Sequence, residues 1–214
     1  MSGRDRILIA LAGIPGSGKS TTAVGVSDLI NLETGKKCTI MPMDGFHLYR
    51  KQLMELPNHE DALARRGSPF TIDGNAFVAS IRQLRESCFT VADERSAISV
   101  PSFCHEIKDP IDNGITIEPD CNVIIIEGLY LLLDNEPWHE ISQLVDDTWF
   151  IDVPMITAAE RVVKRHIRTG IENDVESAKE RVDSNDMVNA VHILSHSSSA
   201  LVRIRSRDIS VKSV

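Results

Sequence analysis

A glycine-rich segment near the start of the chain, AGIPGSGKSTT at residues 12–22, has residue types suited to holding phosphate groups. It contains the full pattern G-x-x-x-x-G-K-[ST], directly after an apolar run and directly before a helical pattern. Glycines let backbone N–H groups approach an anion closely, and the start of the following helix adds a favourable dipole. We therefore predict an ATP-type nucleotide site formed by Gly13, Gly16, Ser17, Gly18, Lys19, Ser20 and Thr21.

Three of these side chains have separate expected roles. Lys19 should reach the β- and γ-phosphates, Ser20 should coordinate Mg²⁺ through its hydroxyl, and Thr21 should donate to the α-phosphate. A loop of this kind serves kinases, ATPases and switch GTPases alike. Other residues must therefore decide where the γ-phosphoryl group goes.

Two acidic residues stand at the ends of later apolar runs. Asp44 ends the run CTIMPMD, and Glu127 follows the run NVIII. If these runs are parallel strands, the two acids lie at the carboxyl edge of the sheet, which is where ligands bind in open α/β sheets. A carboxylate there can accept a proton from an attacking hydroxyl. We predict that Asp44 is a catalytic base and that Glu127 helps to orient Mg²⁺, directly or through water. The alternatives are that Asp44 caps the turn before Gly45 and that Glu127 is merely an exposed acid.

A basic face is predicted on a helix in the second half of the chain. Arg161, Arg165 and Arg168 are spaced i, i+4, i+7 and therefore share one side of that helix. Such arginines can stabilise charge on a transferred phosphoryl group when the helix closes as a lid, and a solvated helix face is the alternative. The apolar residues expected on the opposite side are Val162, Val163 and Ile167.

These residues can meet only if the chain folds around a parallel sheet, which the alternation of apolar runs and helical patterns favours. Residues 45–75 are rich in Pro and Gly and should hold only short helices. Asp73 is an expected N-cap, and Thr157 with Glu160 forms a capping-box pattern at the start of the basic helix. The predicted strands are 6–12, 38–44, 97–103, 122–128, 148–153 and 200–206, and the predicted helices are 19–33, 74–87, 157–169 and 175–194.

The composition limits the classes of partner. The chain has 214 residues and a net charge of −8, which argues against a nucleic acid as ligand because its phosphates need an excess of cations. No apolar stretch reaches the roughly 18 residues of a membrane-spanning helix. Four scattered cysteines without a C-x-x-C pair indicate free thiols in a reducing compartment. We expect a cytoplasmic protein with a single domain over residues 1–214.

Several segments, taken together and in order, resemble a known group of P-loop kinases. They are GIPGSGKST, MDGFHL, RRGSPFTID, VPSF, IIIEGLYLLL, RVVKRHIRTG and SNDMVNA. The group contains uridine kinase, phosphoribulokinase and bacterial pantothenate kinase, and the chain looks most like a poorly characterised bacterial and fungal branch of it. The resemblance implies a P-loop NTPase fold of the α/β class, with a five-stranded parallel core, helices on both faces and a helical lid at about 158–174. It also implies Mg²⁺-dependent transfer of the ATP γ-phosphoryl group to an alcohol of a small metabolite.

The resemblance also implies roles for individual residues. Asp44 falls on the proposed base, Lys19 and Ser20 on phosphate and Mg²⁺ contacts, and Arg161 and Arg165 on lid arginines that bind ATP. Asp44, Lys19 and Arg165 are thus the expected catalytic residues. The SNDMVNA element has no assigned role, and a part in capping and pinning the helix after the lid is the simple alternative. Its matching residues are Asn185, Asp186 and Asn189.

The candidates for contact with the acceptor are His47, Tyr49, Arg66 and His105. The two histidines lie in expected loops, where a binding role competes with a structural one. Arg66 would suit an acceptor that carries a phosphate or carboxylate. The chain departs from the branch at Cys104, because an Asp tends to precede the His there. Asp109 lies too far along the sequence to be a simple replacement.

Other classes of function stay open. A P-loop ATPase or nucleotide switch that acts through a protein partner predicts slow hydrolysis without a small acceptor, although the sequence lacks the N-K-x-D motif that reads guanine. The intact loop disfavours a degenerate kinase kept as a scaffold. For a kinase, the acceptor can be a sugar, a sugar phosphate, a nucleoside or a pantothenate-like alcohol. The aromatic content of 5% slightly favours a sugar or polyol, because stacking on a base needs aromatic rings. A homodimer is left open.

Overall fold

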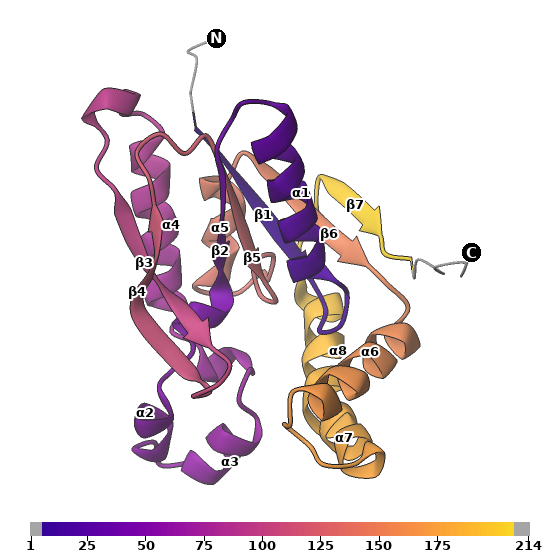
Figure 1. The fold of residues 1–214 in the computed structure, drawn as a ribbon. Coiled ribbons are helices and arrows are strands. Elements are labelled where there is room, and N and C mark those ends of the chain that lie inside the picture. The colour runs from indigo at the N-terminus through magenta and orange to yellow at the C-terminus, as the bar shows by residue number, and fades with distance from the viewer. Residues whose placement is uncertain (1–5, 208–214) are drawn as a thin grey trace.

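The computed structural model describes residues 6–207, and its centre is a sheet of five parallel strands (Figure 1). The strand order is β2-β5-β1-β6-β7, with every neighbouring pair parallel. The predicted parallel core of five strands is therefore confirmed. The strands are β1 (Ile7–Gly13), β2 (Cys38–Pro42), β5 (Val123–Gly128), β6 (Asp147–Asp152) and β7 (Val202–Arg205).

Helices cover both faces of this sheet, as expected for strands that are apolar throughout. Ile9 and Leu11 of β1 belong to a cluster with Ala23 on one face. Leu8 and Ala10 belong to the larger cluster on the other face. Each fully buried aliphatic side chain contributes about 1.5–3 kcal/mol, so these clusters hold the sheet between its helices. The covering helices are α1 (Lys19–Glu33) on the first face and α4 (Gly74–Ser87), α5 (Ile141–Leu144) and α8 (Met187–His196) on the second.

A separate antiparallel hairpin stands beside the sheet. It consists of β3 (Ile98–Cys104) and β4 (Asp109–Ile117), so the strand predicted at 97–103 exists but lies outside the main sheet. The sequence did not indicate β4, because Pro110 and the pair Asn113-Gly114 are typical of turns. Most of its residues are exposed, so it also lacks the apolar run of a buried strand.

The basic helix differs from its prediction at its start and on its buried face. Helix α6 (Met155–Arg168) begins directly after Pro154, so Thr157 lies inside it and the predicted capping box does not form. No described side chain caps its first turn. Its buried residues, spaced i, i+4, i+8, are Ala158, Val162 and His166, so only Val162 of the three apolar residues expected opposite the arginines is buried.

The helix predicted at 175–194 is divided into three parts. Helix α7 (Val175–Arg181) leads into a π-helical turn, Val182–Asp186, which continues as α8. Single π-turns inside helices occur frequently at functional sites. Short helices fill the irregular region as predicted. The remaining helices are α2 (Arg50–Met54), α3 (His59–Ala64) and the 3₁₀ turns Met43–Phe46, Pro69–Thr71, Ala92–Glu94 and Trp138–Glu140.

Asp73 caps α4 as predicted, with Oδ1 accepting a hydrogen bond of 2.9 Å from the backbone N of Ala76. Asp73→Ala should lower the free energy of unfolding by about 1 kcal/mol, because that N–H loses its partner. Asp73→Asn keeps an oxygen in the same place and should lose much less. Urea denaturation of the three proteins measures both differences. Equal losses for the two variants would show that the cap does not stabilise the helix.

None of the helices described in the structure combines the length and the apolar character that a membrane crossing requires.

Candidate active site

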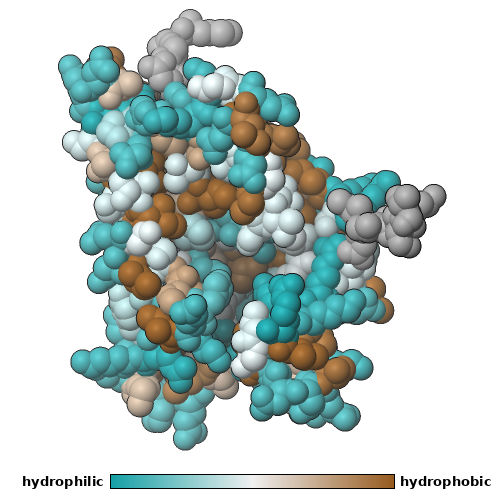
Figure 2. All heavy atoms as spheres, viewed as in Figure 1, coloured by the Kyte–Doolittle hydropathy of each residue, from teal (hydrophilic) through white to brown (hydrophobic). Residues whose placement is uncertain are grey.

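The carboxyl ends of four neighbouring strands meet at one edge of the sheet, and each leads into a predicted functional segment (Figure 1). The glycine-rich loop follows β1, the turn with Asp44 follows β2, and α6 follows β6. Glu127 lies near the end of β5 and is the register partner of Pro42, two residues before Asp44. Figure 2 shows this face hollowed between the part with β3, β4, α2 and α3 and the part with α6 and α7. The topology therefore brings the predicted site residues to one groove.

The glycine-rich loop is held tightly against α6. Gly16 has a φ of +76°, and a Cβ on it would lie 2.3 Å from the carbonyl oxygen of Ala158, so only glycine fits. From the same helix, Arg161 Nη1 donates to the carbonyl oxygens of Gly16 at 3.3 Å and Ser17 at 3.4 Å. In this structure Arg161 braces the loop, and its contact with ATP stays a prediction.

Lys19 is buried at the start of α1, and its Nζ donates to the carbonyl oxygen of Ile14 at 3.1 Å. Burial lowers the pKa of Lys19, while the carboxylates of Glu127 and Asp44 act in the opposite direction. The charge of Arg165 lowers the pKa of Lys19 further. The four charged groups therefore lie within electrostatic reach of one another, as a site for the γ-phosphate of ATP requires.

Ser20 and Glu127 face each other, with Ser20 Oγ donating to Glu127 Oε2 at 3.3 Å. Burial raises the pKa of Glu127, and Asp44 raises it further, whereas Lys19 and Arg165 lower it. In the described part of the chain, no three His, Cys, Asp or Glu side chains form a metal site by themselves. Mg²⁺ usually binds one or two carboxylates together with substrate phosphates, so this pair of hard oxygen donors fits it.

Asp44 lies in the 3₁₀ turn after β2, two residues beyond the end of the strand, and is exposed. Its backbone carbonyl oxygen closes the turn by accepting from the backbone N of His47 at 3.2 Å. The carboxylate is not needed for that bond, which disfavours the reading of Asp44 as a turn cap. A Cβ on Gly45 would lie 2.2 Å from the carbonyl oxygen of Pro101, so β3 packs directly against this turn.

Three of the predicted acceptor-binding residues gather where the hairpin meets this turn. The ring centroids of His47 and Phe103 are 5.1 Å apart, and those of Phe103 and His105 are 5.3 Å apart. The guanidinium carbon of Arg66 lies 5.6 Å from the centre of the Phe103 ring. Burial lowers the pKa of His47, which keeps its ring neutral near pH 7. Phe103 was not predicted, because nothing in the sequence distinguished it from a core aromatic.

Arg66 already has partners, which changes its expected role. Its Nη2 donates to Asp109 Oδ1 at 2.7 Å and to the carbonyl oxygen of Leu48 at 2.9 Å, and its Nη1 donates to the carbonyl oxygen of Lys108. Asp109 stands directly opposite Cys104 in the antiparallel register of the hairpin. The distance along the sequence therefore does not keep Asp109 away from this position, because the hairpin returns it to the place opposite Cys104.

Tyr49 is also engaged, since its hydroxyl donates to Asp112 Oδ1 at 2.6 Å. This bond connects the turn after β2 to the exposed strand β4. Tyr49 thus lies at the outer border of the groove, and its contact with an acceptor stays a prediction.

The SNDMVNA element has a structural role that the sequence left open. Ser68 Oγ is fully buried and donates to Asn189 Oδ1 at 3.2 Å, and Asn185 Nδ2 donates to the carbonyl oxygen of Arg66 at 3.3 Å. The two asparagines therefore anchor the loop RRGSPFTID to α8 and to the π-turn before it. Because the side chain of Arg66 bonds to Asp109, these contacts also connect the π-turn to the hairpin.

Replacing Asn189 by Leu should lower the free energy of unfolding by about 1–3 kcal/mol, because the buried hydroxyl of Ser68 loses its nearer acceptor and keeps only Asn185 Oδ1 at 3.5 Å. Ser68→Ala in the same background should restore part of that loss, because the poorly paired hydroxyl is then gone. Urea denaturation of the original protein, the two single variants and the double variant gives the coupling free energy between Ser68 and Asn189. Strictly additive losses would exclude this hydrogen bond as the stabilising contact.

Asp186 links the same element to α6. Its Oδ2 lies 3.6 Å from Nε2 of the buried His166. Burial raises the pKa of Asp186, and the charges of Arg165 and Arg181 lower it. Burial, with the same two arginines, lowers the pKa of His166 to about 4, so this ring is a neutral structural group. Arg165 therefore lies within reach of both Asp186 and the group around Lys19.

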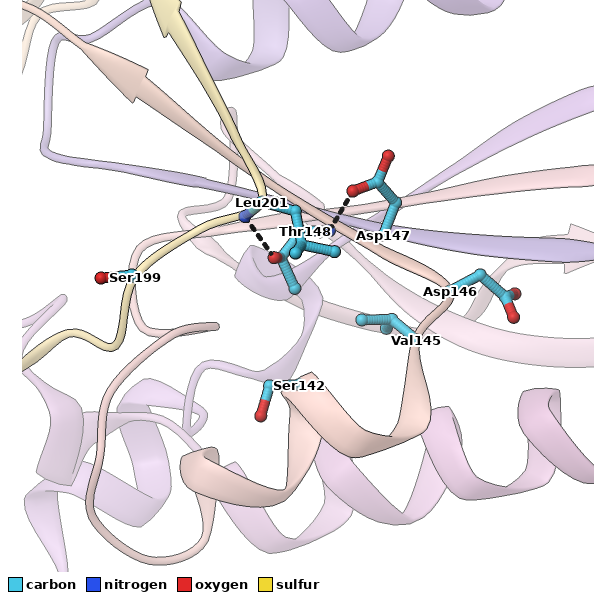
Figure 3. A pocket seen from close by; sticks show the side chains of 7 residues that line it. All are labelled: Ser142, Val145, Asp146, Asp147, Thr148, Ser199 and Leu201. Carbon is cyan, nitrogen blue, oxygen red and sulfur yellow. Dashed lines mark hydrogen bonds between the residues drawn. The ribbon is translucent and has the colours of Figure 1, made fainter.

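A separate surface hollow of about 220 Å³ lies at the opposite edge of the sheet, where β6 begins (Figure 3). Two of its polar side chains already have partners: Thr148 Oγ1 accepts from the backbone N of Leu201 at 3.0 Å, and Asp147 Oδ1 accepts from the backbone N of Thr148 at 2.8 Å. It is remote from the glycine-rich loop and has no place in the chemistry of the groove.

Comparison with known proteins gives a consistent result. The sequence model of the phosphoribulokinase / uridine kinase family matches residues 8–192. The ATP-dependent kinase-like protein notR' of Aspergillus versicolor is 43% identical over 152 residues, which cover 71% of this chain and 87% of that protein.

Two solved structures are similar over almost their whole length. YFH7 of Saccharomyces cerevisiae superimposes with a TM-score of 0.83 at 25% identity, covering 95% of this chain and 94% of that one. A Silicibacter protein, named for an inferred role as a fructose transport system kinase, superimposes with a TM-score of 0.80 at 30% identity. That match covers 94% of this chain and 91% of the other.

Proposed function

Because the chain belongs to the phosphoribulokinase / uridine kinase family, we propose that it transfers the γ-phosphoryl group of ATP to a hydroxyl of a small metabolite. The observation that carries the proposal is the meeting of four segments at one sheet edge. The glycine-rich loop, Asp44, Glu127 and Arg165 come from different elements and share one electrostatic environment. Such a set of groups at the carboxyl edge suits phosphoryl transfer.

In the proposed reaction the acceptor hydroxyl faces Asp44. Its oxygen forms a bond to the γ-phosphorus, its proton passes to the Asp44 carboxylate, and the bond from the γ-phosphorus to the bridging oxygen breaks to release ADP. Lys19 and Arg165 offset the negative charge on the transferred group. An alcohol is a poor nucleophile at neutral pH, so alignment and charge stabilisation supply most of the rate.

Ser20 and Glu127 are the residues that would hold Mg²⁺. When bound with ATP, Mg²⁺ neutralises charge on the phosphate oxygens. The facing oxygens of the two side chains support this assignment, and Lys19 favours the carboxylate form of Glu127 because its charge lowers the pKa of that group.

We assign α6 and the segment after it, about residues 158–174, as the lid of a single catalytic domain. The direct contact between α6 and the glycine-rich loop supports the assignment, because movement of the helix would also move the loop that we propose binds the phosphates. Closure would exclude water from the groove and favour transfer to the acceptor over hydrolysis.

The test is to incubate the purified protein with Mg·ATP and a panel of sugars, polyols, nucleosides and pantothenate-like alcohols. ADP release and product mass are followed together. A phosphorylated product with one acceptor supports the proposal. Equal ATP hydrolysis with every acceptor and with none would favour a P-loop ATPase or nucleotide switch that acts through a protein partner.

A further inference from the structure

We propose that the acceptor site selects an uncharged polyhydroxy compound, a sugar, polyol or nucleoside, and discriminates against acceptors that carry a carboxylate or phosphate. The inference rests on the proposed function and names the chemical class of its acceptor. The selecting feature is Asp109. It forms an ion pair with Arg66, the cation that would otherwise bind an anionic acceptor.

Arg66 belongs to the wall that faces the acceptor. It donates to the carbonyl oxygen of Leu48, the residue after His47, and His47 contacts the carbonyl oxygen of Asp44 through its ring Nδ1 at 2.8 Å. The Arg66 guanidinium also lies against the Phe103 ring, which in turn contacts the ring of His47. An acceptor with its hydroxyl at Asp44 therefore places its remaining atoms beside these groups.

Most donors of the Arg66 guanidinium are already engaged. Of its five N–H groups, the two on Nη2 bond to Asp109 and to the carbonyl oxygen of Leu48, and one of the two on Nη1 bonds to the carbonyl oxygen of Lys108. Its Nε has no partner among the described residues, but it is buried and lies out of reach of a ligand. The side chains of Arg66 and Asp109 are only 13% and 24% exposed. An anion that displaced Asp109 would leave this largely buried carboxylate without its counter-charge, which is unfavourable.

Other cations near the groove do not replace Arg66. Lys19 and Arg165 share the environment of Glu127 and belong to the phosphate side. The side chains of Arg50 and Lys108 are exposed, so solvent and salt screen their charge.

The remaining groups of the wall suit a neutral acceptor. The ring of His47 is kept neutral by burial and can exchange hydrogen bonds with hydroxyls, while Phe103 offers an apolar face to a carbon skeleton. An anionic acceptor would instead meet the exposed carboxylate of Asp44, while the charge of Arg66 is already neutralised by Asp109. Like charges placed together in a binding site reject the wrong partner.

The test uses matched acceptors that differ in charge: glycerol and glycerate, ribose and ribose 5-phosphate, and pantothenol and pantothenate. Phosphorylation of each is measured as kcat/KM from ADP release and product mass. Where either member of a pair is phosphorylated, we expect kcat/KM for the neutral member to be higher by about tenfold or more, a difference of about 1.4 kcal/mol. Equal or greater kcat/KM for the anionic member would overturn the inference and leave the kinase proposal intact.

A binding measurement separates this inference from the proposed function. With the glycine-rich loop filled by a non-hydrolysable ATP analogue and Mg²⁺, calorimetric titration compares both members of each pair without turnover. Tighter binding of the neutral member supports the charge selection even if no acceptor is phosphorylated. Equal or tighter binding of the anionic member overturns it.

Asp109→Asn tests the residue itself. Asp109 Oδ1 accepts a hydrogen bond of 2.9 Å from the backbone N of Arg50. The variant keeps an oxygen for this bond, but it no longer neutralises the charge of Arg66. The preference for neutral acceptors should narrow by about tenfold. Asp120→Asn is the matched control, because it removes one carboxylate from an exposed pair with Lys37 at the other edge of the sheet. An unchanged preference in Asp109→Asn, or the same narrowing in Asp120→Asn, would overturn the assignment.

Discussion

Asp44→Asn should lower kcat for phosphoryl transfer by about 10²- to 10⁴-fold, the usual range for loss of a positioned general base. An amide of the same size cannot take the proton from the acceptor hydroxyl. The turn itself should survive, because its closing bonds use the backbone carbonyl oxygen of Asp44. The affinity for an ATP analogue should change little, since the loop that binds the phosphates follows a different strand.

The measurement is kcat and KM for ATP and for the acceptor, with circular dichroism and analogue titration as checks on the fold. A loss confined to kcat indicates that Asp44 acts in the transition state rather than in ground-state binding. Turnover within about tenfold of the unmodified protein would remove the assignment of Asp44 as base.

The parts of the fold that the sequence predicts are those where local signals agree. The glycine-rich loop stands between an apolar run and a helix, and each of the three indicates the same strand–loop–helix unit. The apolar run VIII could only be a strand covered on both faces, and β5 is such a strand. Asp44 and Glu127 could be placed near each other because parallel strands end at the same edge of a sheet.

The parts that the sequence does not predict depend on contacts between distant segments. Strand β4 is exposed and contains turn residues, so its existence depends on pairing with β3. That pairing is also what brings Asp109 opposite Cys104, a relation that linear spacing conceals. Likewise, the role of Asn189 becomes evident only when α8 meets Ser68, 121 residues earlier in the chain.

Which face of α6 is buried could not be predicted for a related reason. The spacing placed Val162, Val163 and Ile167 opposite the arginines, but the glycine-rich loop contacts α6 along Ala158 and Val162. Arg161 therefore turns toward the loop carbonyls, while Arg165 shares the environment of Lys19. Helical periodicity identifies residues that share a face, but the neighbouring segment decides which face is buried.

Lys19→Ala should reduce kcat by at least about 10²-fold, because it removes a cation that we propose offsets the charge developing on the γ-phosphoryl group. The loss should be larger than the removal of one charge suggests, because Lys19 also lowers the pKa of Glu127. Without Lys19 that pKa rises further, so a larger fraction of Glu127 is protonated at a given pH and cannot help to hold Mg²⁺. The residual activity should therefore need more Mg²⁺ and increase with pH.

These expectations are checked by titrating Mg²⁺ at several pH values for the original protein, for Lys19→Ala and for Lys36→Ala. Lys36 is an exposed lysine before β2 and serves as the matched control. The fold should survive in Lys19→Ala, because removing the ammonium breaks only one hydrogen bond, the one from Nζ to the carbonyl oxygen of Ile14. A parallel fall in activity at all Mg²⁺ concentrations and pH values would show that Lys19 acts on the phosphates alone. Activity equal to that of Lys36→Ala would exclude Lys19 from catalysis.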